Sequence, residues 1–200
     1  MQHFDGKLHL ISRVTEGKEP VPKEHNAQNA LIDACRKGDR SAQKRLYDSL
    51  APKMFAVCLR YMGQRDLAED VLQDGFVTLF GKLDMYSAEG SFEGWARKIF
   101  VNTALMSLRR NDALKMSENL DTVWNLSSES TSQVQDIGYK ELMKLIAELP
   151  AGYRTVFNMF VVEGYSHKEI ADTLGISAET SRSQLARARA MLQDKIRKIR

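Results

Sequence analysis

The sequence predicts an all-α protein of two helical domains joined by a flexible linker, and three observations support this fold. Apolar residues recur at helical spacing from about residue 26 to 111 and again from about residue 134. Strand-like alternation is absent from the sequence. Residues 125–133 are rich in Ser and Thr, which favour local turns over helix. The predicted parts are a loose extension at 1–26, a helical domain at 27–111, a linker at 112–135 and a second helical domain at 136–200.

Composition indicates a globular protein that works in the cytoplasm. Hydrophobic residues make up 43% of the 200 residues and charged residues 28%, and no apolar run approaches the length of about 18 that spans a membrane. The N-terminus lacks the apolar stretch and the cleavage site of a signal peptide. Cys35 and Cys58 lie among apolar neighbours, and the histidines form no cluster. We therefore expect reduced core cysteines, no metal site and no cofactor.

The first domain is predicted to be helical almost throughout, with breaks near Gly38, Pro52, Gly63 and the Tyr86–Ser91 loop. In the second domain, helical periodicity runs to Leu149, and Pro150 is expected to begin another helix, because proline suits the first turn of a helix. A helix-turn-helix follows.

The stretch from Asp66 to Phe80 is predicted to form a helix with one acidic face. Its apolar side is formed by Leu72, Phe76, Leu79 and Leu83. On the opposite side, an arc of about 140° on a helix of about 3.6 residues per turn holds Asp66, Glu69, Asp70, Gln73 and Asp74. Because like charges repel, this face costs stability. Composition alone favours a solvated face. A docking surface for a basic partner, with exposed Val77 beside it, ranks close behind, and a divalent-metal site ranks third because no second carboxylate cluster is evident.

A short loop with Tyr86 leads into a predicted helix that carries aromatic, basic and amide side chains. Aromatic rings stack on unpaired bases, while Arg and Lys hold the phosphate backbone. The candidates for contacts to unpaired DNA are Trp95, Arg97, Lys98, Asn102, Arg109 and Arg110. Phe92, Ile99 and Leu105 are assigned to the core, whereas Trp95 fits either role.

The segment from Ser166 to Leu192 has the pattern of a helix-turn-helix. Ile170, Ala171 and Leu174 have helical spacing and end at Gly175, which readily takes the left-handed conformation that follows a helix. Ser177 then offers an N-cap oxygen for the second helix.

The second helix has one apolar face, formed by Leu185, Ala188 and Leu192, and one outer face, formed by Arg182, Ser183, Ala186 and Arg187. Small and Arg side chains suit the major groove, where Arg can bond guanine bidentately. Residues 182–200 carry a net charge of +6, whereas the whole chain carries +3. A solvated basic helix is the alternative, but the A-x-x-x-G-I-S spacing favours duplex DNA.

Residues 27–200 resemble an RNA polymerase sigma factor of the extracytoplasmic-function (ECF) group of the sigma-70 family. Four blocks occur in the family's order: D-x-A-E-D-x-x-Q-D-x-F at 66–76, F-x-x-W-x-x-x-I-x-x-N-x-A-L-x-x-L-R-R at 92–110, L-P-x-x-Y-R-x-V-F at 149–157 and G-Y-S-H-K-E-I-A-x-x-L-G-I-S-x-x-T at 164–180. The segment T-S-R-S-Q-L at 180–185 is similar to variants common among Bacteroidetes members.

The resemblance implies a role for each face. The acidic helix would dock on a basic coiled coil of the beta and beta-prime subunits of core RNA polymerase through Asp66, Glu69, Asp70, Gln73, Asp74 and Phe76. The Tyr86–Gly94 loop would hold a base flipped from the opened promoter. The melted −10 strand would be contacted by Tyr86, Trp95, Arg97, Lys98, Asn102, Arg109 and Arg110. The −35 duplex would be read by Lys168, Thr180, Arg182, Ser183, Arg187 and Arg189.

The chain departs from the family pattern at four positions. Ser181 stands where a buried Val or Ile is usual, so we expect looser packing of the second helix. Gln184 replaces a common Arg or Lys, which removes an expected phosphate contact. Met106 and Ser107 replace a frequent Asp-Tyr pair and receive no role.

The resemblance predicts a promoter-specificity subunit that is not an enzyme. Its expected partners are core RNA polymerase, promoter DNA and an anti-sigma factor, which in this family is commonly membrane-anchored. Two other functions remain open. A regulator that binds an operator as a dimer predicts palindromic sites and leaves the acidic helix without a role. A metal-dependent nuclease using Asp66, Glu69, Asp70 and Asp74 predicts cleavage that depends on Mg²⁺.

Overall fold

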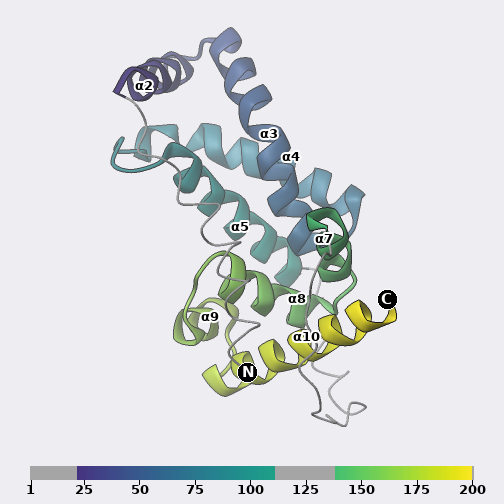
Figure 1. The fold of residues 1–200 in the computed structure, drawn as a ribbon. Coiled ribbons are helices and arrows are strands. Elements are labelled where there is room, and N and C mark those ends of the chain that lie inside the picture. The colour runs from purple at the N-terminus through teal and green to yellow at the C-terminus, as the bar shows by residue number, and fades with distance from the viewer. Residues whose placement is uncertain (1–21, 111–137, 200) are drawn as a thin grey trace. The chain divides into compact units, whose positions relative to one another are not determined.

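The computed structural model describes residues 22–110 and 138–199, which are mostly helical and contain no strand. The prediction of an all-α fold is confirmed. The helices belong to two compact units, and the division falls in the last turns of α5 (Phe92–Arg110). The N-terminal unit, purple to teal in Figure 1, consists of α2 (Pro22–Arg36), α3 (Arg40–Met62), α4 (Arg65–Gly81), the 3-10 turn η1 (Leu83–Met85) and α5.

The C-terminal unit, green to yellow in Figure 1, begins after a stretch that the structure does not describe. It consists of α7 (Tyr139–Ala147), α8 (Ala151–Phe157), the π-helical turn η3 (Asn158–Val162), α9 (His167–Leu174) and α10 (Ala178–Lys198). The predicted linker at 112–135 lies outside the described residues, as does most of the predicted extension at 1–26. Helix α2 nevertheless begins inside that extension, at Pro22, because a proline fits the first turn of a helix, where its missing N–H has no intrahelical partner.

Pro52 lies inside α3, so the predicted break at this residue is wrong. An interior proline removes a main-chain hydrogen bond and costs about 3 kcal/mol. Leu46, Leu50, Met54 and Val57 form a continuous buried stripe on both sides of it. Burying each such side chain contributes about 1.5–3 kcal/mol, so the stripe outweighs the proline. The predicted breaks near Gly38 and Gly63 are confirmed, since α2 ends at Arg36 and α3 at Met62.

The core of the N-terminal unit centres on the rings of Phe76 in α4 and Phe100 in α5. Their centroids lie 5.0 Å apart at 76°, an edge-to-face contact, and Tyr47 of α3 packs 4.4 Å from Phe76. Gly75 allows the close approach of the two helices, because a Cβ atom at this position would lie 2.4 Å from the ring of Phe100. The aromatic contact therefore fixes how α4 and α5 pack within this unit.

Both cysteines are free and buried in the N-terminal unit, as the sequence predicted. Burial raises the pKa of the Cys58 thiol to about 12, so this sulfur stays protonated and unreactive at neutral pH. Their role is packing.

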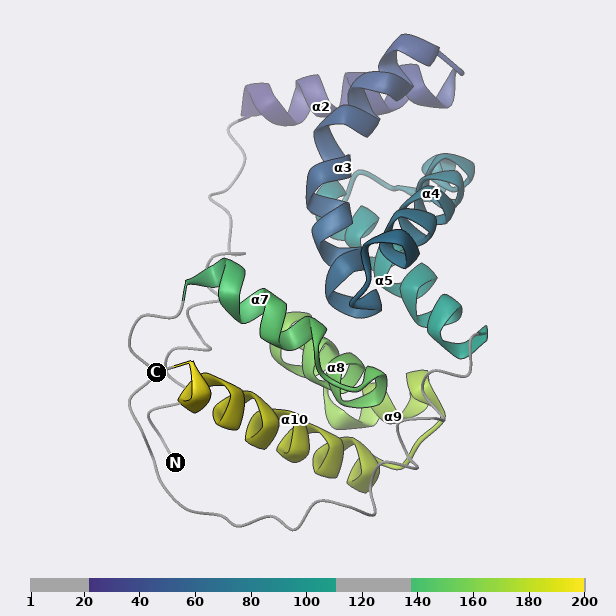
Figure 2. The same cartoon turned by 90° about the vertical axis from the view of Figure 1, so that its right-hand side faces the viewer.

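The C-terminal unit is organised around α10, which packs against α7, α8 and α9 (Figure 2). The apolar face of α10 is buried at Leu185, Ala188 and Leu192, as predicted. Arg154 of α8 is also buried, and its Nη1 donates to the carbonyl oxygens of Ala147 at 2.8 Å and Leu149 at 2.7 Å. This arginine therefore satisfies carbonyl groups at the end of α7 that no helical N–H can reach.

None of the helices in the described part of the chain is long and apolar enough to cross a membrane.

We predict that Gly75→Ala destabilises the N-terminal unit by about 1–3 kcal/mol, because the added methyl group would overpack the contact with Phe100. Gly81→Ala is the matched control in the same helix, since a Cβ there meets nothing within 4 Å. We expect Gly81→Ala to be neutral or to stabilise by up to about 1 kcal/mol. Chemical denaturation of the two variants checks this, and equal stabilities would contradict the proposed close approach.

Candidate functional site

The acidic face predicted on α4 is exposed to solvent in the structure. The side chains of Asp66, Asp70, Gln73 and Asp74 are exposed, and Glu69 is half-buried. Arg65 precedes the acidic run and pairs with Glu69 at 2.8 Å. The carboxylates form an acidic surface along one side of the helix.

Two apolar residues near this face, Val77 and Phe76, differ in their exposure to solvent. Val77 is 75% exposed, as the sequence predicted. Phe76, which the resemblance placed in the docking set, is only 4% exposed and packs against Tyr47 and Phe100. The inclusion of Phe76 as a surface contact is therefore corrected: its ring supports the acidic face from the core. Its place in the stripe with Leu72 and Leu79 already indicated burial.

Helix α5 brings most of the predicted −10 residues onto one face. At about 100° per residue, Trp95, Lys98, Asn102 and Arg109 fall within roughly 60° of one another, and Arg110 lies at the edge of this group. Lys98, Asn102, Arg109 and Arg110 are exposed, whereas Trp95 is half-buried. The combination of cations, an amide and an aromatic ring on one face suits a nucleic-acid strand.

Two residues of α5 differ from the sequence prediction. Arg97 projects more than about 100° away from the face of Lys98 and Asn102, so the helix does not bring it together with the others. Met106 lies on that face, between Asn102 and Arg110, and is 60% exposed. The sequence assigned Met106 no role, although its spacing of four residues from Asn102 could have placed it there.

The loop between η1 and α5 is built around the buried ring of Tyr86. This side chain is 4% exposed, so the prediction that it contacts DNA directly is corrected. Its ring packs 5.0 Å from Phe92 and 5.4 Å from Trp95, and its hydroxyl donates to the carbonyl oxygen of Gly90 at 2.9 Å. Tyr86 therefore shapes the loop from inside. Residues 87–91 are exposed above it.

The helix-turn-helix has the caps that the sequence predicted, and one more. Gly175 takes the left-handed conformation, with φ 71°, directly after α9. The side chain of Ser177 accepts from the N–H of Thr180 at 3.0 Å. Ser166 and Glu169 form a capping box at the start of α9, which the S-x-x-E spacing could have predicted.

Helix α10 presents small side chains outward between two basic flanks. Burial of Leu185 and Ala188 places Ser183 and Ala186 near the centre of the outer side. Arg182 and Arg189 lie on one flank, and Thr180 and Arg187 on the other. The Arg182 side chain is exposed and pairs with Glu179 at 3.0 Å, and Lys168 is exposed on α9.

Two family departures lie on the buried side of α10. Ser181 is fully buried, and its hydroxyl is 2.9 Å from Nδ1 of His167 in α9. A polar contact thus stands where the family usually has an apolar one. Gln184 is 3% exposed, so its side chain is buried and offers no contact to a phosphate, which agrees with the expectation that this contact is missing. Its helical spacing from Ser181 and Ala188 directs it inward.

Metal ligands do not cluster in the part of the chain that the structure describes: no group of three His, Cys, Asp or Glu side chains there could hold a metal ion.

Two family models match separate parts of the chain. Residues 46–114 match the family model Sigma-70 region 2, and residues 139–192 match Sigma-70, region 4. The chain is 27% identical to the ECF RNA polymerase sigma factor SigE of Mycolicibacterium smegmatis, over 94% of this chain and 75% of the relative. It is 28% identical to the ECF RNA polymerase sigma-E factor of Haemophilus influenzae, over 88% of this chain and 98% of the relative.

Among solved structures, the chain is similar to the sigma factor RpoE crystallised in complex with the anti-sigma factor NepR from Bartonella quintana. The two chains are 22% identical with a TM-score of 0.46, and the match covers 78% of this chain and 96% of the other.

We predict that the C-terminal unit loses stability as the pH falls below about 6.5, because of His167. Burial, together with the positive charges of Arg182 and Arg189, lowers the pKa of this imidazole below its ordinary value. The unfolded chain therefore takes up the proton first, and the free energy of unfolding decreases until the pH reaches the folded pKa. Unfolding of the wild type and of His167→Gln across pH 5–8 checks this, and a titration of His167 above pH 6.5 in NMR spectra would contradict it.

Proposed function

The chain belongs to the sigma-70 family of RNA polymerase sigma factors, and we propose that the exposed faces of α4, α5 and α10 each have a separate role in promoter recognition. The protein is a sigma factor that directs promoter-specific transcription initiation with core RNA polymerase. We assign the acidic face of α4 to polymerase docking, the α5 face to the −10 strand and α10 to the −35 duplex. In this role the chain needs no chemistry of its own.

The outer face of α10 is the observation that carries this proposal. A recognition helix must enter a major groove about 12 Å wide, and small outward residues such as Ser183 and Ala186 allow a close approach. The flanking Arg182 and Arg187 then reach base edges or phosphates on either side. The exposed pair between Arg182 and Glu179 is weak in water, so a guanine or a phosphate can replace the glutamate at little cost.

The α5 face supports the assignment to a melted strand. Lys98, Arg109 and Arg110 supply positive charge for successive phosphates, and Asn102 offers an amide to a base edge. The loop above Tyr86 stands at the N-terminal end of this face and would receive an unstacked base. We keep Trp95 as a stacking residue, since it is half-buried and one side of its ring already packs on Phe92.

The acidic face of α4 fits a basic protein partner. Its carboxylates are spread along an exposed helix, which suits long-range attraction and correct orientation during association. We therefore propose that Asp66, Glu69, Asp70, Gln73 and Asp74 contact the polymerase, with exposed Val77 at the edge of the contact. An operator-binding regulator would leave this surface without a role.

We also propose, from the family resemblance, that the protein acts in the cytoplasm and is held inactive by an anti-sigma factor, which is membrane-anchored in many family members.

Run-off transcription tests the function as a whole. Core polymerase from the same source is incubated with a pool of genomic promoter fragments, with and without this protein. We expect transcripts that depend on the protein and start at sites sharing a −35/−10 pair. Tight binding to a palindrome in the absence of polymerase, without stimulated transcription, would support the operator-binding regulator instead.

Charge reversal on α4 tests the docking face. We predict that Asp70→Lys or Asp74→Lys weakens binding to core polymerase at least about tenfold, because each variant places a cation against a basic surface. Asp48→Lys is the control, since Asp48 is an exposed acid of the same unit on α3. Affinity is measured by titration of labelled protein with core polymerase. Promoter preference of the remaining complexes should be unchanged, and a changed preference would contradict the division of roles.

A further inference from the structure

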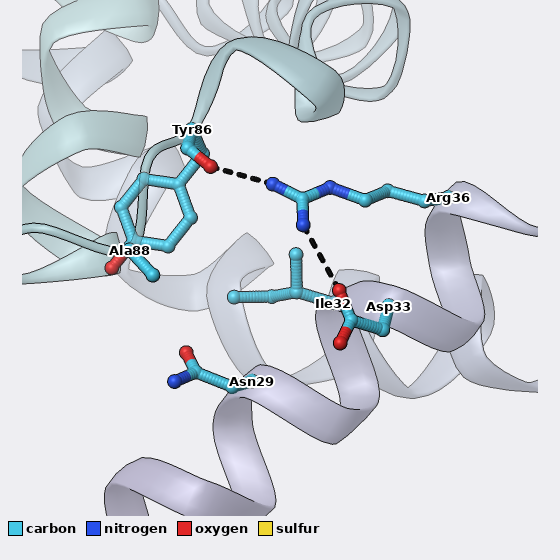
Figure 3. Close-up of a pocket in the computed structure, with 6 residues that line it drawn as sticks. All are labelled: Asn29, Ile32, Asp33, Arg36, Tyr86 and Ala88. Carbon is cyan, nitrogen blue, oxygen red and sulfur yellow. Dashed lines mark hydrogen bonds and ion pairs between the residues drawn. The ribbon is translucent and has the colours of Figure 1, made fainter.

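Arg36, the last residue of α2, ties that helix to the start of the loop around Tyr86. Its Nε and Nη2 donate to the carbonyl oxygen of Leu83 at 3.2 and 3.0 Å, and Nη2 also donates to the carbonyl oxygen of Tyr86. On its other side, Nη1 donates to the carboxylate of Asp33 at 2.9 Å. Figure 3 shows the guanidinium between Asp33 and Tyr86, beside a pocket of about 180 Å³ that Asn29 and Ile32 also line.

These contacts use the planar geometry of arginine. Three of its nitrogen atoms donate in one plane toward two loop carbonyl groups and one carboxylate. A lysine at this position would keep the positive charge but has a single nitrogen and no fixed fork. The side chain is only 28% exposed, so water screens the contacts less than on an open surface.

The segment held by Arg36 is conformationally unfavourable by itself. Ala88 has a φ of 62°, a left-handed conformation that residues other than glycine rarely adopt, and Gly90 follows with a φ of 80°. Such a backbone persists only when its surroundings fix it. Arg36 holds the carbonyl group of Tyr86 from outside, and the Tyr86 hydroxyl holds the carbonyl group of Gly90 from inside. Residues 87–89, exposed between the two tethers, therefore have a defined shape before any ligand binds.

We propose that Arg36 is a positioning residue for recognition of the melted −10 strand. It would not touch DNA. It fixes the loop in the shape that receives an unstacked base, so that little ordering free energy is lost when the base binds. The inference rests on the proposed function of this loop and adds to it a residue about 50 positions earlier in the chain, in a helix that no assignment above places at the DNA.

The test measures the energetic coupling between the Arg36 side chain and each base of the −10 strand. Wild type, Arg36→Ala, Arg36→Lys and the exposed neighbouring control Lys37→Ala are each assembled with core polymerase. Their affinities are measured for a promoter recovered by the run-off experiment, with the −10 region pre-opened as a mismatched bubble. The measurement is repeated with an abasic site at each position of the non-template −10 strand in turn, which gives a double-mutant cycle between the side chain and each base.

We expect Arg36→Ala to weaken bubble binding about tenfold, the size of one lost charged hydrogen bond. Arg36→Lys should not restore the affinity, and Lys37→Ala should behave as wild type. At one −10 position the abasic site should remove the difference between wild type and Arg36→Ala, which identifies the base that the loop receives. Affinity for core polymerase should be unchanged in all variants. If Arg36→Ala fails to fold, the same double-mutant cycle is measured with Arg36→Lys, which keeps the alkyl chain and the positive charge.

The proposal is overturned if the loss in Arg36→Ala persists at every abasic position, because Arg36 then acts through general stability alone. Full activity of Arg36→Lys or binding of Arg36→Ala equal to that of Lys37→Ala also overturns it. These results are distinguishable from failure of the proposed function, in which the wild type itself would start no promoter-specific transcription.

Discussion

The edge-to-face contact between Phe76 and Phe100, made possible by Gly75, determines where the functional faces of the N-terminal unit lie. Each helix here has a buried stripe and an exposed face, so fixing the buried stripes also fixes the exposed ones. With α4 and α5 held at this distance, the acidic residues of α4 and the basic residues of α5 occupy separate surfaces of one unit. Under the proposed function, this separation would let the chain bind polymerase through a negative surface and DNA through a positive surface at the same time.

In the C-terminal unit, small residues at the helix ends determine how α9 and α10 are positioned. The capping box at Ser166 fixes the start of α9, and the left-handed Gly175 and the cap at Ser177 set the turn between α9 and α10. The buried contact of Ser181 with His167 then links the two helices by a hydrogen bond, which fixes their orientation more specifically than apolar packing does. A valine at this position would supply apolar area without fixing an orientation. In this chain a polar contact therefore joins α9 to α10, and we expect protonation of His167 to alter it.

Periodicity and capping signals were sufficient to predict the fold class, the exposed acidic face and the buried stripe of α10, because these features depend on neighbours within a few residues. The break expected at Pro52 was wrong, since a continuous buried stripe outweighed a local preference. Tyr86 and Phe76 were assigned to contact surfaces through family motifs, yet both side chains are buried by packing between helices. A family motif identifies a residue as important, but it does not distinguish a residue that contacts the partner from a buried residue that positions the contacting surface. The assignment of individual residues to polymerase and DNA remains a prediction.

Arg36 shows why such support is hard to predict from sequence. It contacts carbonyl groups 47 and 50 residues away, and a main-chain carbonyl carries no residue-specific signal that a sequence pattern could register. Nothing in the local sequence distinguishes Arg36 from the next residue, Lys37, although Arg36 donates to the carbonyl groups of Leu83 and Tyr86. Ala88 holds an unfavourable conformation, and the bond from the Tyr86 hydroxyl to Gly90 and the bonds from Arg36 hold the backbone on either side of it. Promoter recognition by this chain is therefore expected to depend on a helix that carries none of the recognised DNA-binding motifs.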